Sequence, residues 1–64
     1  MYAIKIREKG KRRWDFLTSD GRLTHLRLHA AMTDDSEKAQ GYVQKITEDN
    51  PGFEAKVVSM FKAN

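Results

Sequence analysis

The chain has 64 residues, no cysteine and a formal net charge of +3, a size that makes a single domain (1–64) with a small core. Without cysteine no disulfide bond can form, so the fold must be held by packing alone or by a partner, and the composition fits a reducing compartment. No apolar run approaches the ~20 residues that span a bilayer, and the first residues lack the apolar stretch of a signal peptide, so we expect a cytoplasmic protein with no membrane partner.

Two strands joined by a basic turn are predicted at the start of the chain. Residues 2–8 alternate between apolar and polar positions, as a strand with one wet face does, and the apolar side is Tyr2, Ile4 and Ile6. Lys9-Gly10-Lys11 predicts a turn, after which Trp14 and Phe16 alternate with Arg13 and Asp15 in a second strand. Residues 19–22 then supply the Asp-Gly pair that a tight hairpin favours.

Residues 23–32 are compatible with two structures. A strand directs one set of side chains outward, His25, Arg27 and His29, and the apolar set inward, Leu26, Leu28, Ala30 and Met32. A helix places Leu23, Leu26 and Ala30 on one face and leaves Leu28 outside it. The strand accounts for more residues, so we adopt it as the third strand and keep the helix as the alternative.

A helix and a final strand follow. Asp34 and Glu37 have the spacing of a capping box, and the apolar residues Ala39, Val43 and Ile46 then recur at helical spacing. Asn50-Pro51-Gly52 ends the helix. Residues 53–61 form the last strand and carry apolar side chains on both sides, which predicts either a central place in the sheet or a homodimer formed through this strand.

The predicted order of elements is β-β-β-α-β. It indicates an α+β domain in which one helix packs on a mostly antiparallel sheet. Trp14 is expected to be at least partly buried. The expected core consists of Ile4, Ile6, Phe16, Leu28, Val43, Ile46 and Val57.

Positive charge is concentrated in the first half of the chain. Residues 1–29 carry eight Lys and Arg against three Asp and Glu, a net +5, whereas residues 30–64 carry four against six, a net −2. Such a split indicates an anionic partner, although a solvated surface that keeps a small domain soluble has the same pattern. The densest cluster surrounds Trp14, which either belongs to the core or stacks on a partner. The candidate partner-binding residues are Lys5, Arg7, Lys9, Lys11, Arg12, Arg13, Arg22 and Arg27.

The sequence holds no constellation typical of catalysis or cofactor binding. His25 and His29 would share a metal ion on a helix, but on the adopted strand they stand about 13 Å apart and lack a third ligand. Gly10 and Gly21 are isolated turn residues rather than parts of a phosphate-binding loop. We therefore expect no catalytic residue, no metal ion and no cofactor.

Part of the chain resembles the arm-binding N-terminal domains of tyrosine integrases. The resemblance rests on residues 9–16, on Asp20-Gly21-Arg22, and on Glu37-Lys38-Ala39 with Tyr42. It implies that the outer sheet face, with Lys5, Arg7, Arg13 and Arg27, enters the major groove of DNA. The strand after the helix is an addition to that pattern.

The whole chain is also similar to short β-β-β-α-β proteins encoded by phages and prophages. This similarity rests on the opening strand 2–6, on the Asp-x-Glu-x-Ala helix start at residues 35–39, and on the closing strand after Asn50-Pro51-Gly52. Some of these proteins inhibit host defence, anti-CRISPR proteins among them. The resemblance implies a non-enzymatic inhibitor or accessory factor that docks on a host protein or nucleoprotein complex. The alternative is a DNA-binding module that uses a basic sheet face.

Overall fold

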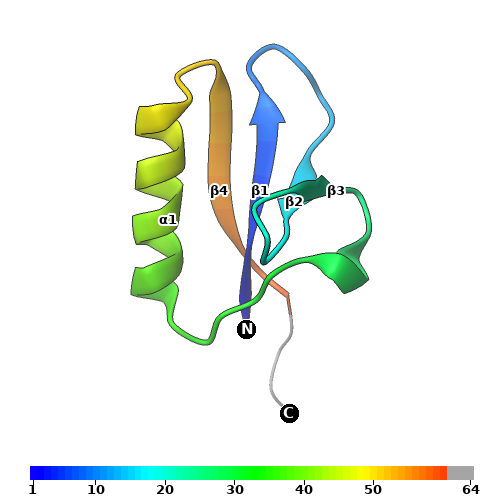
Figure 1. Cartoon of the computed structure of the whole chain (residues 1–64), viewed down its shortest axis with the longest axis vertical. Coiled ribbons are helices and arrows are strands. Elements are labelled where there is room, and N and C mark those ends of the chain that lie inside the picture. The colour runs from blue at the N-terminus through cyan, green and yellow to red at the C-terminus, as the bar shows by residue number, and fades with distance from the viewer. Residues whose placement is uncertain (61–64) are drawn as a thin grey trace.

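The computed structural model describes residues 1–60 and contains one antiparallel sheet and one helix (Figure 1). The strands are β1 (Tyr2–Glu8), β2 (Asp15–Leu17), β3 (Leu23–Thr24) and β4 (Phe53–Ser59), in the sheet order β3-β2-β1-β4. The helix α1 spans Ser36–Asp49. The predicted α+β fold and its β-β-β-α-β order are confirmed.

Strand β1 lies at the centre of the sheet, and β4 lies at its edge. The alternation in residues 2–8 predicted β1 with both of its ends correct. All seven residues of β1 pair with β4, from Tyr2 opposite Ser59 to Glu8 opposite Phe53. Of the two alternatives predicted for the last strand, the central place is therefore wrong, and the homodimer through this strand stays a prediction. Phe61, the last residue of the predicted strand, lies outside the residues that the structure describes.

The apolar residues on both sides of β4 are explained by two separate clusters. On the helix side, β1 contributes the buried Ile4 and Ile6, and α1 contributes Ala39, which is completely buried. On the opposite side, Ala3, Phe16 and Met60 form a second buried cluster. Its partly buried members are Ala30, Met32 and Val58. An edge strand can thus be apolar on both sides, because the segment containing Ala30 and Met32 covers the side that the helix leaves open.

The helix begins one residue later than the capping box predicted. The N-cap is Asp35 rather than Asp34, and its carboxylate accepts hydrogen bonds from the backbone N–H groups of Glu37 (3.0 Å) and Lys38 (3.2 Å). These bonds satisfy donors that the first turn of a helix leaves without partners. At the other end, the backbone N–H of Asn50 donates to Ile46 (2.9 Å), and the helix ends before Pro51 as predicted.

The long third strand predicted for residues 23–32 is wrong. Only Leu23 and Thr24 pair with β2, and Arg27–His29 form a 3₁₀ turn. The chain has to return from β3 to the start of β1, where Thr33 exchanges two backbone hydrogen bonds with Tyr2 (2.7 and 2.9 Å). Since a straight strand would carry the chain away from that place, the segment turns instead.

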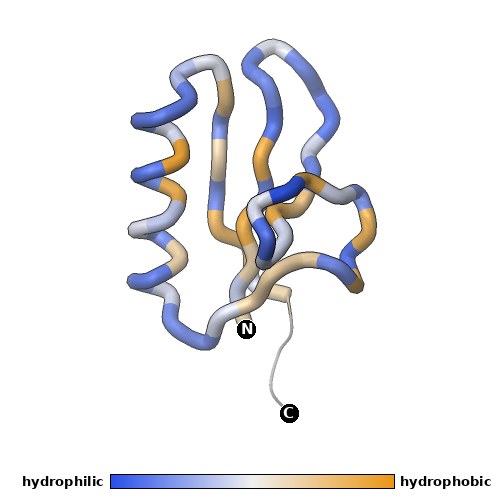
Figure 2. Tube along the Cα trace, in the orientation of Figure 1, coloured by the Kyte–Doolittle hydropathy of each residue, from blue (hydrophilic) through white to orange (hydrophobic). Residues whose placement is uncertain are grey.

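This turn changes the set of core residues. Leu28 is 93% exposed and Leu26 is 46% exposed, so the prediction that Leu28 is buried is wrong. Figure 2 shows that this loop carries hydrophobic positions on the outside of the fold. Of the other predicted core residues, Ile4, Ile6 and Phe16 are buried, whereas Val43, Ile46 and Val57 are half-buried. Within residues 1–60, no helix is long and apolar enough to cross a bilayer.

Candidate anion-binding surface

The tip of the first hairpin holds a group of exposed cations. Gly10 adopts a positive φ of 86°, which lets the chain reverse after β1, and the backbone N–H of Lys11 donates to Glu8 (3.0 Å). The backbone N–H of Lys9 donates to Gly52 (2.9 Å), which ties the tip to the turn between α1 and β4. Lys9, Lys11 and Arg12 are exposed, and none of them forms an ion pair with any residue of the described chain.

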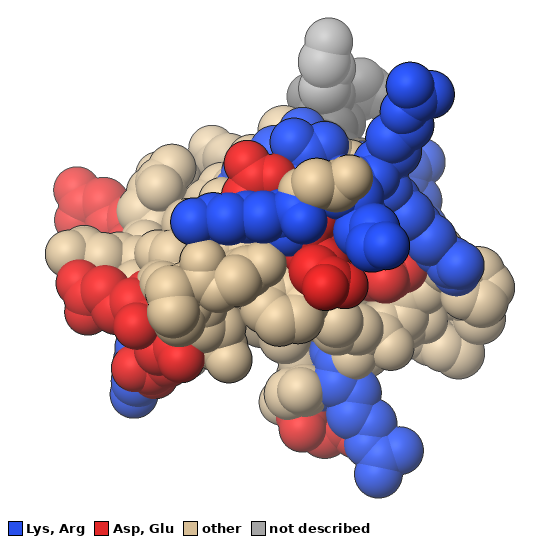
Figure 3. Space-filling model, turned by 90° about the horizontal axis from the view of Figure 1, so that it is seen from above, with Lys and Arg blue, Asp and Glu red and all other residues tan. Residues whose placement is uncertain are grey.

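Arg13 belongs to the same tip but has an acidic neighbour. Its Nε lies 3.5 Å from a carboxylate oxygen of Asp15, and its side chain remains 71% exposed. Seen from above, most of the Lys and Arg side chains gather away from the helix side of the molecule, with some acidic side chains between them, and further Asp and Glu lie on the helix side (Figure 3). The cations of the first half of the chain thus share one region of the surface.

The sheet face opposite the helix carries a second group of cations. Lys5 is paired in register with Phe16 of β2 and with Lys56 of β4, and Arg7 is paired with Glu54. Residues directly opposite each other in adjacent strands project from the same face. We call Lys5, Arg7, Trp14, Glu54 and Lys56 the open-face cluster.

Trp14 connects the members of this cluster. The guanidinium carbon of Arg7 and the Nζ of Lys56 each lie 4.5 Å from the centre of the indole ring. The Nζ of Lys5 lies 5.2 Å from the centre of the Phe16 ring. Cations at such distances are attracted by the electron-rich face of an aromatic ring. Trp14 is half-buried, which confirms that it is at least partly buried, and its contacts are with cations from two strands.

Glu54 is the acidic member of the open-face cluster. Its carboxylate accepts a hydrogen bond from the Nε of Arg7 at 2.7 Å, and the two side chains are 41% and 31% exposed. Glu54 therefore neutralises the charge of Arg7, one of the three cations on this face. Lys5 and Lys56 form no ion pair with any of residues 1–60.

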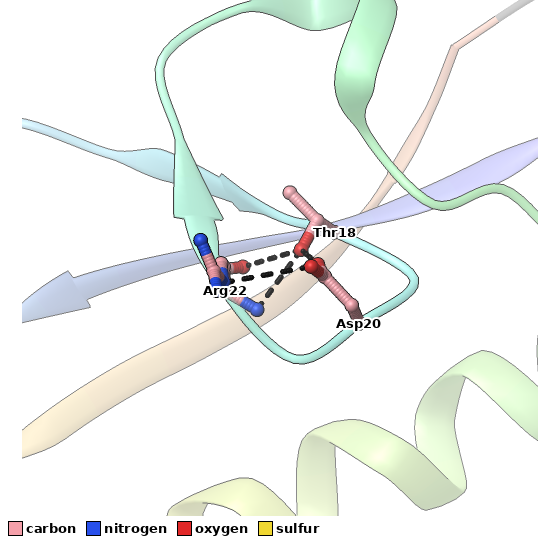
Figure 4. Close-up of polar contacts among 3 residues, drawn as sticks. All are labelled: Thr18, Asp20 and Arg22. Carbon is pink, nitrogen blue, oxygen red and sulfur yellow. Dashed lines mark hydrogen bonds and ion pairs between the residues drawn. The ribbon is translucent and has the colours of Figure 1, made fainter.

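Arg22 lies apart from these cations. It belongs to the turn between β2 and β3, where Gly21 has a positive φ of 84°. The backbone N–H of Arg22 donates to the hydroxyl of Thr18 (2.9 Å), and its Nε lies 3.5 Å from the carboxylate of Asp20, which the Thr18 hydroxyl also contacts (Figure 4). The backbone of Arg22 thus belongs to this turn, and its exposed side chain is paired with Asp20 away from the hairpin tip.

Arg27 is also separate, because it lies in the exposed 3₁₀ turn with His25 and His29 nearby in sequence. The structure thus brings together six of the eight predicted residues at one end of the sheet, either at the hairpin tip or on the open face: Lys5, Arg7, Lys9, Lys11, Arg12 and Arg13. It leaves Arg22 and Arg27 elsewhere.

The sequence reasoning did not find Lys56 and Glu54. Both lie in the last strand, about 50 positions away from their neighbours Lys5 and Arg7. The signal that could have found them is the pairing of the first and last strands. Residues 2–8 and 53–59 have equal lengths, and antiparallel pairing places these charged residues opposite each other.

Residues 1–60 carry further features that bear on ligand binding. No group of three or more His, Cys, Asp or Glu side chains is arranged to hold a metal ion there. An open hollow lies between α1 and the sheet and is lined mostly by apolar side chains, including Ile6, Leu17, Tyr42 and Phe53. The most pronounced chemical feature of the described surface is therefore its group of cations. Comparisons with protein-family models, with curated proteins and with solved structures found no match for this chain.

Proposed function

We propose that this chain is a non-enzymatic binding protein that docks its basic end on an anionic surface of a larger host protein or nucleoprotein complex. The observation that carries this proposal is the hairpin tip, where Lys9, Lys11 and Arg12 project without an acidic partner among the described residues. Adjacent cations on one short segment generate a high local potential, which steers an anionic partner toward it.

In this proposal the chain acts in the cytoplasm by occupying a surface. A small domain that covers part of a larger complex blocks or modifies what that complex binds, and about 800 Å² on each partner suffices for a specific contact. The resemblance to short phage and prophage proteins supports an inhibitor or accessory factor of this kind. The cysteine-free composition supports a reducing compartment.

A second candidate function is DNA binding through the basic face of the sheet. One specific observation favours it, namely that the face opposite the helix carries Lys5, Arg7 and Lys56. The resemblance to integrase arm-binding domains implies the same use of this face. The two candidates differ in what salt changes most. Binding to a phosphate backbone releases condensed counterions, so its affinity falls steeply with salt, whereas electrostatic steering toward a protein surface acts mainly on the association rate.

Replacing Lys11, Arg12 and Arg13 together by alanine should weaken docking while leaving the fold intact. Exposed charges contribute about 0–1 kcal/mol each to stability, so the melting curve should change little. The loss should fall mainly on the association rate, because these side chains act through long-range attraction. A pull-down from a bacterial lysate, with and without nuclease, supplies the partner, and surface plasmon resonance at two salt concentrations then compares parent and variant.

Random duplex DNA is the second probe in that experiment. A variant that binds the purified partner as tightly as the parent at both salt concentrations contradicts docking through the hairpin tip. Loss of capture after nuclease treatment, together with binding of the parent to random duplex DNA, selects the second candidate function.

We also propose a homodimer formed through β4. The backbone N–H groups of Lys9 and Met60 bond across the β1–β4 pair, to Gly52 and Met1. Alternation therefore turns the N–H groups of Ala55, Val57 and Ser59 toward the free edge, where a second β4 can pair. Sedimentation velocity should show a dimer that Ala55→Pro, which removes one outward donor, converts to monomer. A parent chain that stays monomeric at high concentration contradicts this arrangement.

A further inference from the structure

Lys5 and Lys56 place two like charges side by side on the open face. They are direct partners in the antiparallel pairing of β1 with β4, and like charges in such positions destabilise a sheet. The three ion pairs found among the described residues involve Arg7, Arg13 and Arg22, so neither lysine has a carboxylate partner there. The strand register thus places two lysines side by side without a carboxylate partner among the described residues.

Both ammonium groups are held by aromatic rings. The Nζ of Lys56 lies 4.5 Å from the centre of Trp14, and the Nζ of Lys5 lies 5.2 Å from the centre of Phe16, which is buried. Arg7 packs on the same indole ring from two positions further along β1. Three cations from two strands are therefore arranged in advance around two rings, and an anion that binds there does not have to order them.

We propose that Lys5, Lys56 and Arg7 form a binding site for the phosphate groups of a nucleic-acid backbone. This inference rests on the second candidate function, because it requires a nucleic acid as the partner. Ammonium and guanidinium groups are the side chains that bind phosphate in proteins, and a phosphate between Lys5 and Lys56 removes their repulsion. Trp14 acts as a positioning residue that holds Arg7 and Lys56.

The arrangement of the cations favours a linear polyanion over an acidic protein. Lys5, Arg7 and Lys9 follow each other at every second position of β1 and the turn after it, with about 7 Å between successive residues. The row ends at Lys9, where the chain turns and the backbone N–H of Lys11 donates to Glu8. A nucleic-acid backbone presents phosphates at regular intervals along one line, whereas carboxylates on a protein surface are interspersed with cations.

Glu54 lowers the affinity of this site for phosphate. Its carboxylate occupies the Nε of Arg7 at 2.7 Å and adds a negative charge on the face that receives the phosphates. Glu54→Gln should therefore tighten binding to nucleic acid, because it removes that charge and releases the guanidinium of Arg7. The matched control is Glu48→Gln, the same change on the exposed surface of α1, which should leave the affinity as it is in the parent.

The test measures binding of the full chain to a fluorescein-labelled 20-nucleotide DNA, as a single strand and as a duplex, by fluorescence anisotropy over a range of salt. Lys5→Gln/Lys56→Gln should bind about tenfold or more weakly at low salt, and its slope of log affinity against log salt on the duplex should be smaller by about 1.8. The control Lys38→Gln/Lys45→Gln removes the same charge from α1 and should keep the affinity within about threefold of the parent, as expected for a distant surface change.

The single tryptophan of the chain reports on the site directly. Binding should change the emission of Trp14, because a phosphate held by Arg7 and Lys56 places a negative charge beside the indole ring on which both cations pack. Trp14→Ala should weaken binding, and Trp14→Phe, which keeps an aromatic face for the two cations, should restore most of the loss. Equal weakening by both substitutions, with folded circular-dichroism spectra, would overturn the positioning role.

Three results would overturn the phosphate site itself. The first is a parent chain that binds neither DNA form at low salt, or binds poly-glutamate as tightly as DNA. The second is a Lys5→Gln/Lys56→Gln variant that binds DNA like the parent, while the triple alanine variant at Lys11, Arg12 and Arg13 does not bind. That result contradicts the phosphate site but agrees with docking through the hairpin tip. The third is weaker binding by Glu54→Gln, a result that does not depend on the folding of the lysine variant.

Discussion

Replacing Ile6 by alanine should lower the free energy of unfolding by about 2–5 kcal/mol, the range for truncating a buried isoleucine. Ile6 is 6% exposed, lies on the central strand β1 and faces the helix side of the sheet. The cost combines the lost burial of the side chain with the cavity that remains. Because small domains are stable by about 5–15 kcal/mol at most, urea denaturation followed by far-UV circular dichroism should show a large shift of the midpoint.

The matched control is Leu28→Ala, another truncation of a large aliphatic residue. Leu28 is 93% exposed, so its substitution should change the free energy of unfolding by less than about 0.5 kcal/mol. The comparison of the two variants distinguishes two placements of Leu28. The alternation in residues 23–32 predicts a buried Leu28, whereas the structure exposes it. A Leu28 variant that is destabilised as strongly as the Ile6 variant would refute the exposed 3₁₀ turn.

Replacing Ala39 by leucine should destabilise the domain by about 1–3 kcal/mol through overpacking. Ala39 is 0% exposed and is the most deeply buried residue of α1, on the side that packs against β4 and β1. A larger side chain there has to push the helix away from the sheet or adopt a strained rotamer. Thermal unfolding monitored at 222 nm measures the loss.

Gln40→Leu is the control for this second substitution. It introduces the same side chain at the next position of α1, which is exposed, and glutamine and leucine have similar helix propensities. Its effect should stay within about 0.5 kcal/mol of zero. Equal losses for both variants would mean that the change at Ala39 acts through the helix itself and not through packing on the sheet.

The elements that the sequence predicts well are those with local signals. The alternation of residues 2–8 defines β1, and the apolar spacing between the acids near residue 35 and Asn50-Pro51-Gly52 defines α1. In both cases the residues that form the element also carry the information about its period and its ends. The displacement of the N-cap from Asp34 to Asp35 is small, because neighbouring aspartates offer the same carboxylate to the first turn.

The structure of residues 23–32 could not be predicted in this way. Their alternation satisfies a strand, but the chain has to cross from β3 to the start of β1, where Thr33 pairs with Tyr2. That requirement depends on the order of the strands in the sheet and not on the segment itself. The same holds for β4, whose two apolar sides predicted either a central place or a homodimer. The structure places β4 at an edge, where the second cluster of Ala3, Phe16 and Met60 covers the side opposite the helix.

The candidate binding surface was also predictable only in part, and the distinction is again between local sequence signals and tertiary structure. The sequence by itself determined the α+β class, the concentration of positive charge in the first half, and the presence of Lys5 and Arg7 on one side of β1, because composition and alternation are local properties. Only the tertiary structure decided that Lys56 and Glu54 join them around Trp14, while Arg22 and Arg27 lie elsewhere. The physical reason is strand register, since backbone hydrogen bonds between the first and last strands place side chains about 50 residues apart on one face.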